Sequence, residues 1–406
     1  LIDNGLYGVS ATYELQPDWR IKVFGGKQKN LFETYESFIK GVVIDGYLSI
    51  GEENKVALVP GFGVINKTFS DDQIDELIST VRTYTPQDSL GLYYNSYAAS
   101  IYNTLSFGPI TWYVEGAVKT RDIYFDPDAE RSLYTGENTL GRFRNDAGSV
   151  LYSSLGFGKK GFGASFEYKR TENFSFRADP FTALNRGIVN YLPPMSKINT
   201  YRLKSRYTPA PRELAEEAIQ VEIRYTPVKK WRIVHYFSNI TDLSGNQLYR
   251  EIDNEINFRP SVANQITFGI QAQTYNQAIY EGKSGVPNVK TVTPYFEWFR
   301  KLSARKSMKI EAQFMSTKQD FGSWAFALIE YSIAPRWSFA LSDMYNVDPI
   351  KTAALHYPRV DVVFVQKTNR FGLSYIKQVE GVVCAGGICR LEPAFSGIRF
   401  SLNSTF

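Results

Sequence analysis

The 406-residue sequence contains only two cysteines and two histidines, which leaves little material for metal sites built on those side chains. Its longest apolar run, residues 324–329, is far shorter than the roughly 18–20 residues of a membrane-spanning helix. This excludes a helical membrane protein. The excess of one charge over the other is also small, because 46 Lys and Arg residues are nearly balanced by 41 Asp and Glu residues. A net charge of +5 is too dilute for a dedicated nucleic-acid binder, so we expect no nucleic-acid partner.

Catalytic motifs are absent as well. The sequence has no G-x-S-x-G and no H-E-x-x-H, and His235 and His356 are far apart. The glycine pairs in residues 156–158 and 161–163 lack the Lys-Ser/Thr of a phosphate-binding loop and are typical of hairpins. We therefore predict no enzymatic activity, no cofactor and no metal site.

The sequence is rich in aromatic residues and in segments where apolar and polar side chains alternate. Phe, Tyr and Trp make up 15% of the chain, and apolar residues 43%. Apolar and polar side chains alternate with a period of two in many segments, whereas helical periodicity is scarce. Clear examples are residues 7–15, 162–169, 219–225 and 308–314. Each such segment predicts a β-strand with one apolar and one polar face.

Short and long connections alternate along the chain. Several tight turns end in a tryptophan, namely Trp19, Trp231 or Trp337. The long polar connections are expected near 27–40, 67–88, 126–148, 173–198, 276–288 and 347–356. Short turns on one side and long loops on the other are typical of a transmembrane barrel. We therefore predict an all-β fold, a single domain over residues 1–406. It is a large antiparallel up-and-down transmembrane β-barrel of about 18 or more strands, with long external loops carrying short helices.

Two loop segments have helical features. Residues 70–82 start with Ser70 as a candidate N-cap and present an apolar face, which predicts a helix. A second short helix is expected at 212–218. Because a spanning strand at 199–218 would disturb the alternation of turns, we expect those residues to form an external loop that pairs with itself.

The predicted barrel assigns positions to several sets of side chains. Trp19, Trp231 and Trp337 would form an aromatic girdle at the headgroup level. Ile398, Phe400, Leu402 and the terminal Phe406 resemble the C-terminal assembly signal of outer-membrane barrels, and Phe406→Ala should reduce membrane assembly. The polar strand faces would line the lumen with Arg20, Lys22, Glu115, Lys119, Arg121, Glu167, Lys169, Glu222, Arg224, Lys309 and Glu311.

The strand order also carries an expectation about the ends of the chain. If tight turns are periplasmic, the first strand descends from outside, whereas a bacterial barrel ordinarily starts in the periplasm. We therefore expect an odd number of upstream strands and a signal peptide before residue 1.

Cys384 and Cys389 are separated by four residues, two of them glycine. In an oxidising envelope we expect them to form a disulfide, with free thiols or a metal site as alternatives.

Two blocks of sequence carry a resemblance to a family. One block is Asn190-Tyr191-Leu192-Pro193 with residues 200–203; the other lies within residues 318–346 and continues at 380–390. The chain resembles an uncharacterised family of Bacteroidota outer-membrane β-barrels, a domain of unknown function. The resemblance implies architecture, a location in the bacterial outer membrane and a segment upstream of residue 1, and it brings no catalytic residues.

Function is predicted only as a class. The leading hypothesis is a porin-like barrel of the Gram-negative outer membrane with a polar lumen, acting in transport or as an envelope component. An alternative is a non-transporting subunit of an outer-membrane assembly or secretion complex. Another is a secreted all-β adhesin-like sandwich. The expected partners are outer-membrane lipid, the barrel assembly machinery and other envelope proteins.

Overall fold

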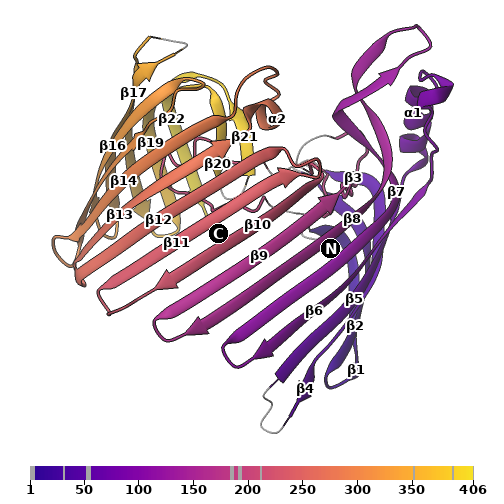
Figure 1. Cartoon of the computed structure of the whole chain (residues 1–406), viewed down its shortest axis with the longest axis horizontal. Coiled ribbons are helices and arrows are strands. Elements are labelled where there is room, and N and C mark those ends of the chain that lie inside the picture. The colour runs from indigo at the N-terminus through magenta and orange to yellow at the C-terminus, as the bar shows by residue number, and fades with distance from the viewer. Residues whose placement is uncertain are drawn as a thin grey trace.

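The computed structural model of the chain describes residues 5–30, 33–51, 56–182, 187–190, 194–210, 213–350, 353–385 and 388–405. Within these residues, twenty strands form one large antiparallel sheet, and two further strands form a separate hairpin (Figure 1). The predicted all-β fold of about 18 or more antiparallel strands is confirmed.

The strands of the large sheet are β1 (Leu6–Gln16), β2 (Trp19–Lys29), β3 (Thr34–Gly46), β4 (Leu48–Ile50), β5 (Val56–Thr68), β6 (Asn95–Phe107), β7 (Ile110–Ser132), β8 (Asn138–Lys159), β9 (Phe162–Glu172), β10 (Glu216–Tyr225), β11 (Trp231–Asp242), β12 (Gln247–Ser261), β13 (Asn264–Tyr275), β14 (Val289–Lys301), β15 (Lys306–Met315), β16 (Gly322–Ile333), β17 (Trp337–Pro349), β18 (His356–Gln366), β19 (Asn369–Gln378) and β22 (Phe395–Ser404). The separate hairpin is β20 (Gly381–Ala385) and β21 (Ile388–Glu392). The helices are α1 (Asp71–Val81), the 3-10 turn η2 (Pro86–Asp88) and α2 (Gln277–Glu281).

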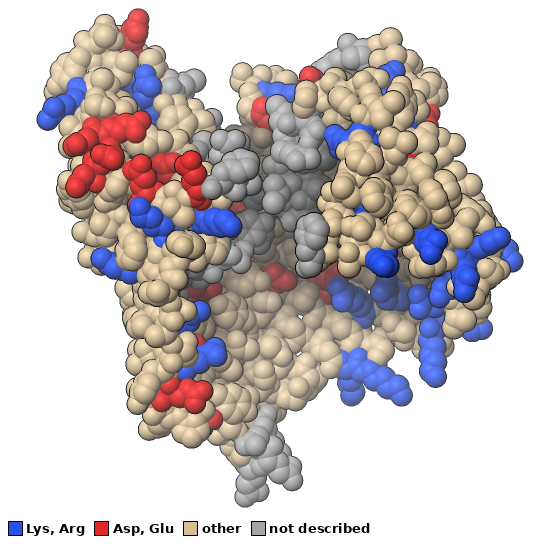
Figure 2. Space-filling view, turned by 180° about the vertical axis from the view of Figure 1, so that it is seen from behind, with Lys and Arg blue, Asp and Glu red and all other residues tan. Residues whose placement is uncertain are grey.

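Nearly every strand pairs with its neighbours in the chain, as in an up-and-down barrel. β3 and β4 pair with successive parts of β5, so together they occupy one strand position in the wall. The twenty strands therefore fill nineteen strand positions. Within the described residues, β1 pairs only with β2, and β22 only with β19. The wall is therefore open between β1 and β22, and Figure 2 looks into the resulting hollow.

The two faces of the wall differ in chemistry. On β13, for example, Phe268 and Ile270 face outward and are exposed, whereas Thr267 and Gln271 face inward and are buried. The secreted sandwich would bury its apolar rows between two stacked sheets, so that alternative is wrong: here a single curved sheet leaves those rows on the outside.

As predicted, one end of the wall carries only short connections, while the other end mixes the long connections with three short ones, at 30–33, 133–137 and 243–246. The short-turn end of the wall carries the connections at 17–18, 108–109, 160–161, 226–230, 262–263, 302–305, 334–336 and 367–368. Gly108 and Gly161 have positive φ angles of 53° and 82°, which L-residues rarely adopt, and this explains glycine in these two turns.

The opposite end holds the longer connections and both α-helices (Figure 1). α1 confirms the helix predicted at 70–82, and Ser70 and Gln73 form a capping box at its start. Ile74, Leu77 and Val81 pack against Ile123 and Phe143 of the β7–β8 hairpin.

Three details of the predicted loops are wrong. Residues 126–148 mostly continue β7 and β8, whose lengths of 23 and 22 residues carry the hairpin well beyond its neighbours. β2 and β3 likewise extend into the loop predicted at 27–40, which shrinks to residues 30–33. Of the helix predicted at 212–218, residues 216–218 belong to β10, because they alternate and pair with β9 and β11.

None of the helices in the described ranges is long and apolar enough to cross a membrane.

Candidate functional site: a lumen crossed by residues 173–215

The described parts of residues 173–215, which connect β9 to β10, fold into the lumen; we call them the crossing segment. Phe176, Leu203 and Tyr207 of this segment are at most 2% exposed. The prediction of an external loop that pairs with itself is therefore wrong for residues 199–215. Their apolar side chains are instead buried against the inner face of the wall, and the described residues among them contain no strand.

One end of the crossing segment is attached to the wall built by β2 to β8. Phe174, Phe176 and Ala178 pack in one cluster with Ile39 and Ile65 of β3 and β5. Backbone carbonyls of the segment accept hydrogen bonds from wall side chains, because Lys67 Nζ donates to Arg177 at 2.8 Å and Gln28 Nε2 donates to Ile188 at 2.8 Å. Apolar burial and polar contacts thus hold the same stretch.

The other end is attached to a separate arc of the wall, β10 to β17. Leu203 and Tyr207 belong to a cluster that includes Tyr275, Met315 and Trp324. The Leu203 amide donates to Gln313 Oε1 at 2.8 Å, and the Tyr207 hydroxyl donates to Asp320 at 3.0 Å. With both ends fixed, the crossing segment narrows the lumen.

A buried polar network joins the segment to β12. The fully buried Asp253 accepts hydrogen bonds from Lys204 at 2.7 Å and from Lys197 at 2.9 Å. The Tyr295 hydroxyl donates to Asp253 at 3.2 Å and to Glu255 at 3.0 Å. The Asp253 carboxylate thus has two cations beside it, which is the condition under which a buried ion is tolerated.

Burial and pairing act differently on the two lysines. For Lys204, burial outweighs the attraction of Asp253, and its pKa falls below the usual value. For Lys197, burial also opposes the charge, but the attraction and hydrogen bond of Asp253 outweigh it, and its pKa is raised. Lys204 therefore depends most on keeping its carboxylate partner.

Most of the side chains predicted for the lumen lie on the inward face. Their contacts there are Arg20 with Asp45 at 2.5 Å, Glu115 with the Tyr113 hydroxyl at 2.7 Å, Glu167 with the Tyr152 hydroxyl at 2.8 Å, Lys169 with Glu216 at 2.6 Å, Arg224 with Glu222 at 2.5 Å, and Lys309 with Glu311 at 3.3 Å. Lys22 shares the face of the buried Gln28, and Lys119 donates to the Asp146 carbonyl at 2.5 Å.

Arg121 is placed differently. The register with β8 shifts between Lys119 and Asp122, so the inward position passes to Asp122. Asp122 is buried beside Lys67, whereas Arg121 is exposed. A bulge of this kind reverses strand alternation, and the sequence pattern gave no sign of it.

The predicted girdle residues lie next to short turns on the outward face. Trp231 stacks on Phe258 with ring centroids 4.3 Å apart, and Trp337 lies 4.6 Å from Phe364. Trp19 begins β2 opposite Gly46.

On β22, Ile398, Phe400 and Leu402 project outward and are exposed. The remaining member of the predicted assembly signal, Phe406, lies outside the described residues. Cys384 and Cys389 are direct partners in the β20–β21 hairpin, a register compatible with the predicted disulfide.

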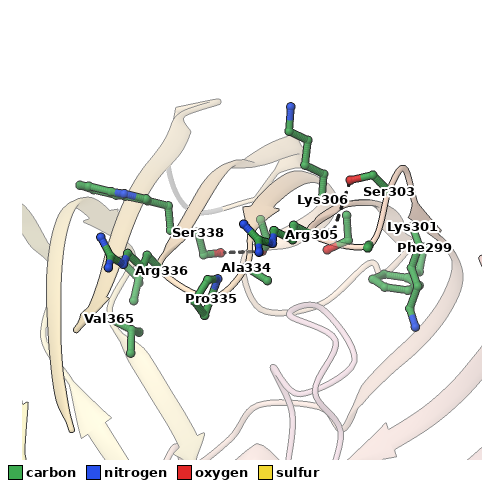
Figure 3. Close-up of a pocket in the computed structure, with 15 residues that line it drawn as sticks. Phe299, Lys301, Ser303, Arg305, Lys306, Ala334, Pro335, Arg336, Ser338 and Val365 are labelled. Atoms are coloured by element: carbon green, nitrogen blue, oxygen red, sulfur yellow. Dashed lines mark hydrogen bonds between the residues drawn. The ribbon is translucent and has the colours of Figure 1, made fainter. Parts of the chain in front are cut away.

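Two cavities on the inner wall were not predicted. A cavity of about 470 Å³ lies at the short-turn end, around the turns 302–305 and 334–336. Figure 3 shows Arg305, Ala334 and Pro335 near its centre, with Lys301 and Lys306 extending from its edge. Deeper in the lumen, a cavity of about 670 Å³ is lined by β16 to β19, by β22 and by Arg202 of the crossing segment.

Some of these cavity residues carry a sequence signal. Arg359, Arg370 and Arg399 occupy inward positions that alternate with apolar outward ones, so the period-two pattern was sufficient to find them. Arg202 lies in the crossing segment, where no periodicity exists. In the described parts of the chain, no group of three or more His, Cys, Asp or Glu residues is arranged to hold a metal ion.

The fold and the lumen together define an up-and-down β-barrel with a polar interior. The chain belongs to DUF6029, a family of unknown function whose sequence profile matches residues 1–406. None of the curated proteins compared with the sequence matches it.

Several solved structures are similar in outline. OccAB2 of Acinetobacter baumannii is 9% identical with a TM-score of 0.42, covering 97% of this chain and 96% of that one. OccK5 (OpdH) of Pseudomonas aeruginosa is 10% identical with a TM-score of 0.39, covering 98% of both chains. The copper transporter OprC is 7% identical with a TM-score of 0.42, covering 98% of this chain and 71% of that one. Values this low carry no information about substrate.

Proposed function

We propose that this protein is an integral barrel of the bacterial outer membrane that passes small solutes through a lumen narrowed by the crossing segment. The observation that carries the proposal is the exposed apolar exterior. Outward side chains on strand after strand are large and apolar, for example Val9, Ile101, Phe268 and Leu341, and each is at least half exposed. Soluble monomers rarely expose apolar patches of this extent, whereas lipid would cover them.

Neighbouring residues on β17 test the membrane assignment. Leu341 projects outward with 55% exposure, and Ser342 projects inward to line the larger cavity. Arginine facing the bilayer core costs about 2–4 kcal/mol, so Leu341→Arg should sharply reduce the heat-modifiable protein recovered from membranes. The matched variant Ser342→Arg should assemble normally. Equal assembly of both variants, or full-length protein that stays monomeric without detergent, would contradict the proposal.

Conductance tests the transport function. In planar bilayers, the full-length protein should form discrete channels, and replacing residues 197–210 by a Gly/Ser linker should enlarge their conductance. The hydrogen bonds that pair β9 with β10 do not involve those residues, so the wall should still form.

A second candidate is a non-transporting subunit of an outer-membrane complex. Its support is the β7–β8 hairpin with α1, which projects beyond the wall and offers an exposed acidic face to a partner (Figures 1 and 2). It would be favoured if the wild type and the linker variant were both silent in bilayers while correctly assembled.

We infer further that additional strands close the wall. With nineteen crossing strands joined by antiparallel pairings, β1 and β22 run in the same direction. One further strand, or another odd number, would let both open edges pair antiparallel. Unpaired edges are a liability in any sheet, and in lipid their backbone groups have no water to bond.

A further inference from the structure

The larger cavity gathers positive charge. Five cationic side chains line it, namely Arg202, Arg359, Arg370, Lys377 and Arg399, against two acidic ones, Glu330 and Asp361. They come from the crossing segment, β16, β18, β19 and β22, so the fold brings them together from segments far apart in the sequence.

Most of this charge is not neutralised within the described chain. Arg359 and Asp361 pair with each other through two hydrogen bonds of 2.7 and 2.9 Å. Arg202, Arg370 and Lys377 have no carboxylate within ion-pair distance in the described residues, and neither has Arg399. Glu330 is therefore the single carboxylate left to balance four cations.

The effect of this concentration of positive charge is seen in the pKa of Arg202. Burial in the crossing segment, together with the nearby guanidinium groups of Arg206 and Arg359, lowers its pKa to about 10. Like charges held together are stabilised by a counter-ion, and guanidinium groups bind carboxylate and phosphate with two parallel hydrogen bonds.

The positive lining continues to the mouth. The smaller cavity shares Ser338 and Val363 with the larger one. It adds four cations and no carboxylate, the cations being Lys301, Arg305, Lys306 and Arg336. Figure 2 shows Lys and Arg gathered along the lower right margin, on the side of the molecule formed by the later strands. A solute entering from the short-turn end would meet cations throughout.

We propose that the larger cavity is a binding site for small polyanions bearing carboxylate or phosphate groups, and that the smaller cavity guides them to it. This assignment rests on the proposed channel function for the route of entry, but not for binding itself. The volume of about 670 Å³ suits a solute of the size of citrate or pyrophosphate, and several converging cations favour more than one negative charge.

Binding is tested by calorimetry on the full-length protein in detergent, titrated with citrate, pyrophosphate and uncharged sucrose. We expect saturable binding of one or both anions and none of sucrose. Citrate alone would identify carboxylates, and pyrophosphate alone phosphates. Arg370→Gln and Lys377→Gln should each weaken binding about tenfold, while Arg370→Lys should keep part of it. Lys229→Gln, in an exposed turn outside both cavities, is the matched control. Equal affinity in all variants, or no binding of either anion, would overturn the proposal.

Ion selectivity separates this inference from the channel function. In a KCl gradient across a planar bilayer, the reversal potential should indicate preference for chloride, and Arg370→Gln with Lys377→Gln should reduce that preference. A cation-selective channel would contradict the anion site and leave the channel standing. A silent protein that still binds citrate or pyrophosphate would contradict the channel and leave the site standing.

Discussion

Lys204 in the crossing segment and Asp253 on β12 form an ion pair of 2.7 Å with both side chains at most 1% exposed. Lys197 meets the same carboxylate at 2.9 Å but is 24% exposed. The two lysines therefore share a partner and differ in how much water reaches them, which makes them a matched pair for mutation.

Replacing Lys204 with Met should release this end of the crossing segment. Breaking a buried ion pair costs about 3–5 kcal/mol when a charge is left alone, and Lys197 offsets part of that cost. We expect larger or fluctuating channel conductance and faster proteolysis within residues 194–210. Lys197→Met should have a much smaller effect. If the two variants behave alike, Lys204 is not the main anchor.

Glu213 should make the attachment of the crossing segment dependent on pH. Burial raises the pKa of this carboxyl, and the nearby Glu216 carboxylate raises it further. Its folded pKa lies above its unfolded one, so its contribution to stability is complete below the unfolded pKa, around 4.5, and is lost as pH rises through the raised value.

Glu213→Gln should therefore raise the thermal midpoint at neutral pH and flatten the fall of that midpoint as the pH rises above about 4.5. Differential scanning calorimetry in detergent measures both. Glu217→Gln, on the outward side of β10 beside Tyr168, serves as the control. A lower midpoint for Glu213→Gln at pH 7 would mean that the ionised form is needed.

Cys384 and Cys389 should be oxidised to a disulfide in protein isolated from the envelope. Opposed residues in an antiparallel hairpin have Cα atoms about 4.5–5.5 Å apart, within the range that a disulfide spans. Alkylation before reduction should label neither cysteine, as judged by mass spectrometry. Labelling of both would contradict the prediction. Replacing both by serine should destabilise only this hairpin, by about 2 kcal/mol.

The edges of the wall should be protected in the full-length protein. Backbone amides of β1 and β22 that have no partner among the described residues should exchange slowly with deuterium if further strands pair with them. Exchange as fast as in the 226–230 turn would show that the edges remain open. The amides that join β12 to β13 provide the slow reference.

The sequence was sufficient to predict the strands of the wall but not the segment that folds into the lumen. Alternation along residues such as 219–225 has one simple physical cause, a strand whose two faces meet different surroundings, and the structure has β10 there. The helix at α1 was found because capping by Ser70 is a local signal.

The crossing segment had no comparable signal. Leu203 and Tyr207 are buried by residues more than 60 positions away, such as Tyr275 and Trp324, and only the curvature of the wall brings them near. The bulge before Asp122 was hidden for a similar reason, because its inward position is set by Lys67 on another strand.

The crossing segment also has a mechanical consequence. Separate apolar clusters attach it to β3–β8 and to β10–β17. It therefore acts as a strut between two arcs of the wall, whose distance from each other the hydrogen bonds between strands alone would not fix. A change in the cross-section of the barrel must strip one of those clusters from its arc. The bore is thus expected to be stiff along the line of the strut and compliant across it.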